Sequence, residues 1–184
     1  MTLEHLTALA TSPELGRLER GGSQPQLVFT RTLAYPRDAV WRAITEPEHR
    51  ARWFPDSVDG AFEPGAKLRF FSEEHDFEFD GEVLTCEPPA LLEIRWGTDN
   101  LRFELRAEGD QTVLTLTDTF DELGKAARDG AGWHECIDRL EFELAGREPD
   151  FRPGQRWGDV HPRYVTTFGP DASSIGPPEG WEPE

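Results

Sequence analysis

The sequence predicts an α+β fold in which a curved antiparallel sheet wraps around a long helix near the C-terminus. Five consecutive segments between residues 67 and 119 alternate apolar and polar side chains, a pattern typical of a sheet with one buried face. A later helical stripe of apolar side chains consists of Trp133, Ile137, Leu140 and Leu144. We expect this stripe to lie on the apolar face of the sheet.

Residues 1–23 are predicted to form a loosely organised arm before the main domain, which we expect to span residues 24–146. The arm carries leucines that could dock on the body of the protein: Leu3, Leu6, Leu9, Leu15 and Leu18. Glycines and a serine at residues 21–23 mark its end. From residue 24 to residue 34, alternating apolar and polar side chains predict the first strand.

Two short helices are predicted after the first strand. Pro36 suits the first turn of the first helix, because a helix leaves the N–H at that position without a partner. Thr45 and Glu48 match the T-x-x-E capping box. They predict the start of a second helix that ends near Trp53 and Phe54.

Opposite charges set the register of the first hairpin, whose strands are residues 67–72 and 77–85. Its cross-strand pairs, charged on one face and apolar on the other, are Lys67–Glu82, Arg69–Asp80, Phe70–Phe79 and Leu68–Gly81. Because side chains alternate across a strand, a slip of one residue would invert every pair. The pattern therefore fixes which face is polar.

Extending this register through the next turns predicts an apolar inner face that contains one carboxylate. The predicted inner pairs are Val83–Ile94, Gly81–Trp96, Trp96–Leu101, Ile94–Phe103, Leu92–Leu105, Leu105–Leu114, Phe103–Leu116 and Leu101–Asp118. The outer face then contains two conflicts between like charges, Arg95–Arg102 and Glu93–Glu104.

The last helix of the main domain is expected to span about residues 131–145. With its apolar stripe on the sheet, Glu135, Asp138 and Arg139 are expected to point into solvent. Phe142 also points away from the stripe, which predicts that another segment covers it.

Residues 147–184 form a tail whose proline and glycine content alone would suggest disorder. Its aromatic residues instead predict a short helix near residues 159–168, with Pro162 in the first turn. The aromatic face of this helix consists of Trp157, Tyr164 and Phe168. We expect that face to cover Phe142, and the chain to fray after about Pro170.

The chain has 36 acidic and 19 basic residues and a formal net charge of −17 at pH 7. This charge repels phosphate backbones and anionic lipids, which argues against nucleic-acid and membrane partners. The N-terminus lacks the apolar core of a secretory signal, and no segment approaches the ~18 apolar residues of a membrane span. Two cysteines, Cys86 and Cys136, suggest reduced thiols and a cytoplasmic protein.

Four separated motifs resemble a known family. They are PRDAVWRAITEPEHRARWF at 36–54, FDGEVLTCEPPALLEIRWG at 79–97, LTLTDTF at 114–120 and GWHECIDRL at 132–140. Over roughly residues 26–146 the chain resembles the activator of Hsp90 ATPase homologue 1-like family of the START/Bet v 1-like (SRPBCC) superfamily. The resemblance implies a helix-grip fold, with two short helices after the first strand and a curved antiparallel sheet around the long C-terminal helix.

The apolar sheet face and the helix stripe outline a cup, which predicts the binding of a small hydrophobic or aromatic molecule. The predicted ligand-binding residues are Phe70, Phe79, Trp96, Phe103, Leu116, Asp118, Trp133, Ile137 and Leu140. Two interpretations of Asp118 are open. It is either a solvated carboxylate at a strand end or an orienting contact to a polar group of the ligand.

Two other functions are compatible with the sequence. The superfamily resemblance permits a cyclase- or hydratase-type enzyme with Asp118 or His134 as general base. The family resemblance also permits a co-chaperone-like module that binds proteins, and a homodimer is left open. No residue pattern identifies a catalytic residue, a cofactor or a metal site.

The adjacent residues His134, Glu135 and Cys136 are not expected to form a metal site. Neighbours on a helix diverge by about 100° and cannot share one ion. His134 and Asp138 are interpreted as a solvated pair on the helix surface. Cys136 is interpreted as a buried, inert thiol.

Overall fold

The computed structural model describes residues 14–177 and contains one eight-stranded antiparallel sheet of order β1-β2-β8-β7-β6-β5-β4-β3. The strands are β1 Arg17–Glu19, β2 Gln26–Leu33, β3 Ser57–Asp59, β4 Lys67–Ser72, β5 Phe77–Glu87, β6 Leu91–Trp96, β7 Asp99–Glu108 and β8 Gln111–Thr119. The helices are α2 Arg37–Thr45, α3 Pro47–Arg50, η1 Leu123–Lys125, α4 Ala126–Leu144, α5 Gln155–Phe168 and η2 Pro170–Ala172. None of these described helices is long and apolar enough to cross a membrane.

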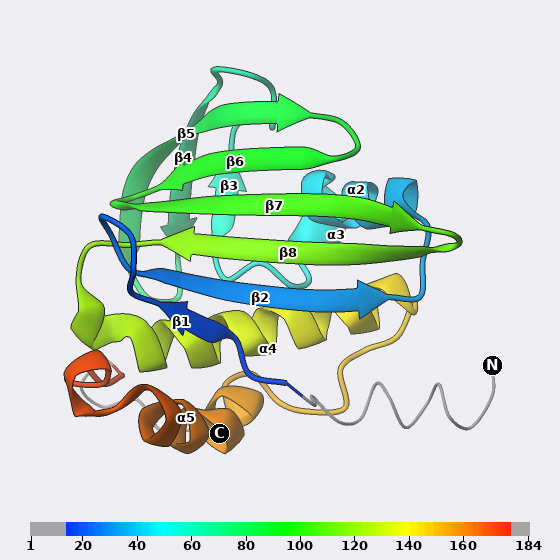
Figure 1. Ribbon diagram of the computed structural model, residues 1–184. Coiled ribbons are helices and arrows are strands. Elements are labelled where there is room, and N and C mark those ends of the chain that lie inside the picture. Colours follow the sequence, from blue (N-terminus) through cyan, green and yellow to red (C-terminus); the bar gives the residue numbers. More distant parts are fainter. Residues whose placement is uncertain (1–13, 178–184) are drawn as a thin grey trace.

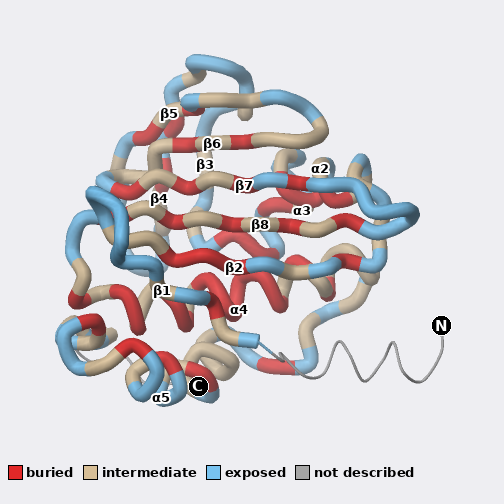
Figure 2. The backbone as a smooth tube through the Cα atoms, viewed as in Figure 1, coloured by how far each residue is buried: buried red, intermediate tan, exposed pale blue. Residues whose placement is uncertain are grey.

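The architecture is the α+β helix-grip fold that the sequence predicts. Two short helices follow β2, and the curved sheet lies over the long helix α4, with α5 on the other side of α4 (Figure 1). Burial is concentrated where α4 faces the sheet (Figure 2). Side chains that are at most 2% exposed form the centre of this core: Phe70, Phe103, Leu116, Ile137 and Leu140.

The structure confirms most of the predicted sheet register. Strands β4 and β5 pair as predicted, with Phe70 opposite Phe79, and so do β7 and β8. Strands β5 and β6 begin in the predicted register, but an unpredicted irregularity between Val83 and Thr85 shifts it.

The predicted register of β6 and β7 is wrong by two residues. Their turn is two residues shorter than predicted, so Ile94 opposes Leu101 and not Phe103. A slip of two residues keeps the same side chains on the inner face, which is why the apolar pattern does not exclude it. On the outer face, the observed register joins Glu93 to Arg102 by an ion pair of 2.8 Å and removes both conflicts between like charges.

The capping box predicted for the second short helix does not form. Glu46 is the N-cap residue of α3, and no side chain caps this helix. The hydroxyl of Thr45 instead donates to the carbonyl of Trp41 at 2.8 Å, within α2. Pro36 is likewise the N-cap residue of α2 and does not lie in its first turn. The two helices stay separate because Glu46, which precedes Pro47, is extended.

Two aromatic residues after α3 enter the space between the sheet and α4. Trp53 is 2% exposed and donates its indole N–H to the Ala43 carbonyl at 2.8 Å. The ring centroid of Phe54 lies 6.0 Å from that of Phe70 and 5.9 Å from that of Trp133. These two rings fill part of the cup in which the sequence predicts a ligand.

Helix α4 is longer than predicted and is covered on two sides. It begins at Ala126, directly after η1, about five residues before the expected start. Glu135 and Asp138 are only 9% and 6% exposed, so the prediction that they point into solvent is wrong. Helix α5 packs along this second side of α4 (Figure 1).

Phe142 is covered, as predicted, but by a different residue. Its side chain is 1% exposed and meets the ring of Phe151 edge-on at 5.9 Å. The predicted cover is occupied elsewhere, because the rings of Tyr164 and Phe168 lie over Gly130 near the start of α4. Phe142 is therefore covered by the loop between α4 and α5, and not by α5 as the sequence predicts.

Helix α5, Gln155–Phe168, begins about four residues before the predicted start. Pro162 consequently lies inside the helix and not in its first turn. Beyond the helix, the N–H of Ile175 donates to the carbonyl of Gly124 at 3.0 Å, next to α4. The fraying predicted for this segment is wrong, and residues 178–184 lie outside the described part of the tail.

Part of the N-terminal arm joins the sheet, because β1 pairs with β2. Leu15 and Leu18 pack against the core. The N–H of Gly16 donates to the hydroxyl of Tyr164 at 2.8 Å, so the arm contacts α5 as well as the sheet. The remaining leucines predicted to dock lie outside the described residues: Leu3, Leu6 and Leu9.

Replacing Gly81 with alanine should destabilise the sheet strongly. A Cβ at this position would lie 2.2 Å from the carbonyl oxygen of Arg95 and 2.5 Å from the ring of Phe70. We expect Gly81→Ala to cost about 3 kcal/mol, the upper end of typical overpacking, and to lower Tm by about 6–12 °C in a thermal melt. Gly21→Ala is the control, because nothing lies within 4 Å of its added Cβ. Equal melting temperatures for the two variants would contradict this close packing.

Candidate functional site

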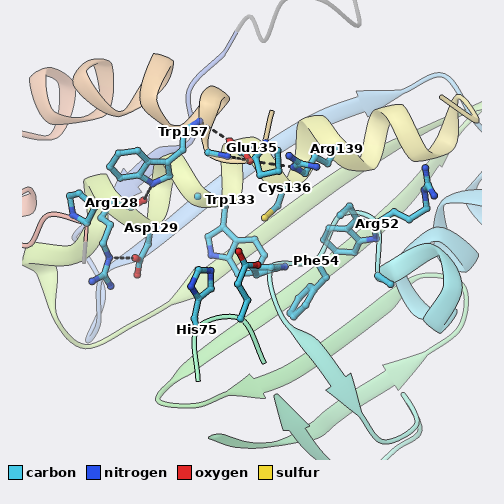
Figure 3. Close-up of a pocket in the computed structure, with 18 of the residues that line it drawn as sticks. Arg52, Phe54, His75, Arg128, Asp129, Trp133, Glu135, Cys136, Arg139 and Trp157 are labelled. Atoms are coloured by element: carbon cyan, nitrogen blue, oxygen red, sulfur yellow. Dashed lines mark hydrogen bonds and ion pairs between the residues drawn. The ribbon is translucent and has the colours of Figure 1, made fainter. Parts of the chain in front are cut away.

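A groove of about 670 Å³ opens beside Phe54 and Trp133 (Figure 3). It is bounded by α4, the segment after α3, the turn between β4 and β5, and the loop that leads into α5. Its apolar lining includes Trp53, Phe54, Trp96, Trp133, Cys136 and Trp157. Four of the six tryptophans of the chain therefore line one groove.

Trp96 and Trp133 meet in the groove with ring centroids 5.3 Å apart and ring planes at 62°. Both indoles donate their N–H groups to carboxylates. Trp96 donates to Asp56 at 2.7 Å, and Trp133 donates to Asp118 at 3.1 Å. These bonds fix the orientation of the two rings. Burial raises the pKa of Asp56 to about 6, although the bond from Trp96 acts in the opposite direction.

Asp118 is fully buried, so its interpretation as a solvated strand-end carboxylate is wrong. It lies opposite Leu101, as predicted, but the corrected register of β6 and β7 places Ile94 in this row, and Trp96 lies in the next inner row. Burial, with the nearby Asp99 charge, raises the pKa of Asp118 well above its ordinary value. Its Oδ1 has no hydrogen-bond partner among residues 14–177. Asp118 does not line the groove, but it accepts a hydrogen bond from Trp133, which does.

Three acidic side chains gather beside the groove: oxygen atoms of Asp99, Asp118 and Asp129 lie within 4.8 Å of one another, and Asp129 lines the groove. Such oxygens are the ligands that hard cations take. The ammonium of Lys125 already lies 2.8 Å from both oxygens of Asp99 and 3.7 Å from Asp129. Despite Lys125, burial raises the pKa of Asp99. The cluster is therefore a buried charge network in which a lysine supplies the positive charge.

The arginines that line the groove are all paired with carboxylates. Arg128 Nε lies 2.7 Å from Asp129, and Arg139 Nε lies 3.3 Å from Glu135. Arg52 Nε lies 2.5 Å from Glu143 Oε2, outside the groove. None of these guanidinium groups brings an uncompensated positive charge to the groove.

Glu135 connects α4 to the start of α5. Its Oε1 accepts the N–H of Gly154 at 2.9 Å, and its Oε2 accepts the N–H of Trp157 at 2.9 Å. Gly154 is the N-cap residue of α5 and cannot cap the helix with a side chain. The carboxylate of Glu135 supplies the acceptors and the negative charge that a helix N-terminus favours. This contact holds Trp157 in the groove wall (Figure 3).

His134 is fully buried, so its interpretation as a solvated residue is wrong. Its Nδ1 lies 2.8 Å from the hydroxyl of Tyr164 on α5. Burial lowers the pKa of His134 to about 4. Cys136 is buried, as predicted, and burial raises the pKa of its thiol, although the residue borders the groove.

The predicted ligand-binding residues separate into two groups. Trp96 and Trp133 line the groove. Phe79 is partly buried and packs against the core. The others lie in the packed interior: Phe70, Phe103, Leu116, Asp118, Ile137 and Leu140. Binding by any of the nine stays a prediction. The residues that sequence reasoning missed, Phe54, Trp157 and Glu135, come from segments whose positions depend on tertiary packing.

The sequence profile of a family described as "Activator of Hsp90 ATPase homolog 1-like protein" matches residues 34–145. A search of curated proteins gives no match.

Solved structures share the fold. EF2215 from Enterococcus faecalis, a conserved protein of unknown function, has a TM-score of 0.69 and 20% identity over 83% of this chain and 89% of its own. CalU16 from Micromonospora echinospora has a TM-score of 0.67 and 24% identity over 83% of this chain and 94% of its own. DynU16, described as a protein in the dynemicin biosynthetic locus, has a TM-score of 0.60 and 28% identity over 69% of this chain and 51% of its own.

Replacing Glu135 with alanine should loosen the start of α5. The variant removes both acceptors from the N–H groups of Gly154 and Trp157, which we expect to cost about 2 kcal/mol. Hydrogen exchange of these two amides should accelerate, and Tm should fall by about 4–8 °C. The exposed Glu122, changed to alanine, is the control. Unchanged exchange at Gly154 and Trp157 would show that the contact does not hold the helix.

Asp118 should make stability fall as pH rises. Its folded pKa is raised, so its contribution is fully present below the unfolded pKa of about 4 and is lost as pH rises through the folded value. Asp118→Asn stays neutral and keeps an oxygen for the Trp133 N–H. Thermal melts from pH 5 to pH 9 should show the wild type losing several degrees relative to this variant. The exposed Asp121, changed to asparagine, should follow the wild type. A constant difference between wild type and Asp118→Asn would contradict the raised pKa.

Proposed function

Since the chain belongs to the Activator of Hsp90 ATPase homolog 1-like family, we propose that it binds a small hydrophobic or aromatic molecule, in the groove lined by four tryptophans. The single observation that carries this proposal is the groove itself. Its volume of about 670 Å³ falls in the range of small-molecule sites, about 300–1,000 Å³, and such sites combine apolar walls with a few polar groups.

The predicted binding residues fit this proposal in two ways. Trp96 and Trp133 would contact a ligand directly. Phe70 and Phe103 lie behind Phe54 and Trp53 and would reach a ligand only if these two rings moved. Asp118 lies behind Trp133, to which it is hydrogen-bonded. DynU16, a structural relative, is described as a protein in a biosynthetic locus, which supports a role with a small molecule.

The alternatives have weaker support. A cyclase- or hydratase-type enzyme needs a general base that can reach its substrate, and neither Asp118 nor His134 is among the described residues that line the groove. A co-chaperone-like module needs an exposed apolar surface. The large hydrophobic side chains that stand out as exposed on the described part of the chain are Phe77 and Leu84, both on β5.

Filling the groove from Gly132 tests the proposal. A Cβ added at Gly132 would have one neighbour within 4 Å, the ring of Trp157 at 4.0 Å. The Gly132→Leu variant should therefore fold, with its side chain in the groove. The neutral dye N-phenyl-1-naphthylamine, followed by its fluorescence and by tryptophan quenching, should bind the variant at least about tenfold more weakly. Gly132→Ala is the matched control, because it gains a similar helix propensity with little added volume.

Two results would contradict the proposal. Equal dye affinity for the leucine and alanine variants would place binding outside the groove. No binding to the wild type at any accessible dye concentration would remove the support for a small apolar ligand.

A further inference from the structure

We propose that the groove selects ligands that carry a positive charge next to an apolar or aromatic group, such as an aryl or alkyl ammonium. This inference rests on the proposed function and specifies the ligand class of the same groove. It follows from the aspartates that accept the indole N–H groups and from the charged side chains around the groove.

Two rings in the groove donate their N–H groups to aspartate oxygens. Trp96 donates its N–H to Asp56 at 2.7 Å, and Trp133 donates its N–H to Asp118 at 3.1 Å. The face of an indole ring is already the negative part of its quadrupole, and tryptophan is the side chain that binds cations best through its face. An oxygen acceptor at the N–H edge adds electron density to the ring, which strengthens this attraction.

The charges around the groove also favour a cation. Each arginine in its lining is paired with a carboxylate, so none is left to attract an anion by its net charge. Glu74 lines the groove, and Asp56 accepts the indole N–H of Trp96 from outside the lining. Neither carboxylate has an ion-pair partner among residues 14–177. The chain as a whole carries a formal charge of −17, which raises the local concentration of cations.

Two of the four tryptophans can present their surfaces to a ligand. Trp96 and Trp157 are partly exposed and come from β6 and α5, on two different walls of the groove. One face of Trp157 stacks on His161 with ring centroids 4.2 Å apart, which holds the ring in place. Figure 3 shows Trp157 and Trp133 on the α4 side of the groove and His75 from the β4–β5 turn facing them.

Two probes of equal shape isolate the effect of charge. Benzyltrimethylammonium and neopentylbenzene differ by one atom, a quaternary nitrogen in place of a carbon. Binding of each to the full chain is measured by tryptophan fluorescence and calorimetry at 0.15 M and 0.5 M salt. We expect the ammonium to bind about tenfold more tightly than the hydrocarbon. Benzylsulfonate, the anionic probe, should bind more weakly than either.

A pair of variants locates the effect. Asp56→Asn removes a charge but keeps an oxygen for the Trp96 N–H, and it should reduce the preference for the ammonium at least about threefold. Asp110→Asn removes the same charge from the turn between β7 and β8. That turn lies eight residues along the strand from Asp118, on the order of 25 Å. This control should retain the full preference, and a thermal melt of each variant shows that both are folded.

The outcomes separate this inference from the proposed function. Equal binding of the ammonium and the hydrocarbon, or tighter binding of the sulfonate, overturns the cation preference and leaves the proposed function standing. If the preference for the ammonium disappears at 0.5 M salt, or falls equally in both variants, it comes from the net charge of the chain. Either result overturns the role of the groove in selecting a cation. The absence of binding by all three probes and by the neutral dye overturns both.

Discussion

Helix α4 is buried on two opposite sides, and the rest of the structure depends on this constraint. Its apolar side packs on the sheet, but its second side carries groups that are costly to bury without partners. Asp138 has an ion pair of 2.8 Å with Arg31 of β2 and another of 3.2 Å with Arg156 of α5. His134 contacts the Tyr164 hydroxyl, and Glu135 holds the first turn of α5. The tail is thus fixed by polar contacts with α4. The arm is linked to α4 through the Tyr164 hydroxyl, which also accepts the N–H of Gly16.

The fold could be predicted from the sequence where neighbouring segments constrain each other. Alternation and charge pairs set the β4–β5 and β7–β8 registers, because a slip of one residue would place charges in the core. The β6–β7 error has a different origin, since a slip of two residues keeps the same faces. The charges on the outer face could have identified the correct register, because only the observed register places Glu93 opposite Arg102.

The candidate site was harder to predict, because most of it depends on segments that meet only in the folded chain. A helical projection treats the side of α4 away from the sheet as solvated, so Glu135 and Asp138 were misplaced. Phe142 on the same side was the signal that this surface is covered. Trp53 and Phe54 follow a very short helix, and no periodicity indicates that they enter the core.

The groove is formed by residues inside the region that matches the family profile and by residues of the tail, outside that region. The family profile ends at residue 145, whereas Pro153, Gly154, Trp157 and Pro177 of the groove wall lie beyond it. Most of the groove wall therefore belongs to the shared scaffold, and the part that the tail adds beside α4 lies outside the matched region. Ligand preference can then diverge within the family without any change in the scaffold, simply by exchange of the tail that closes the groove.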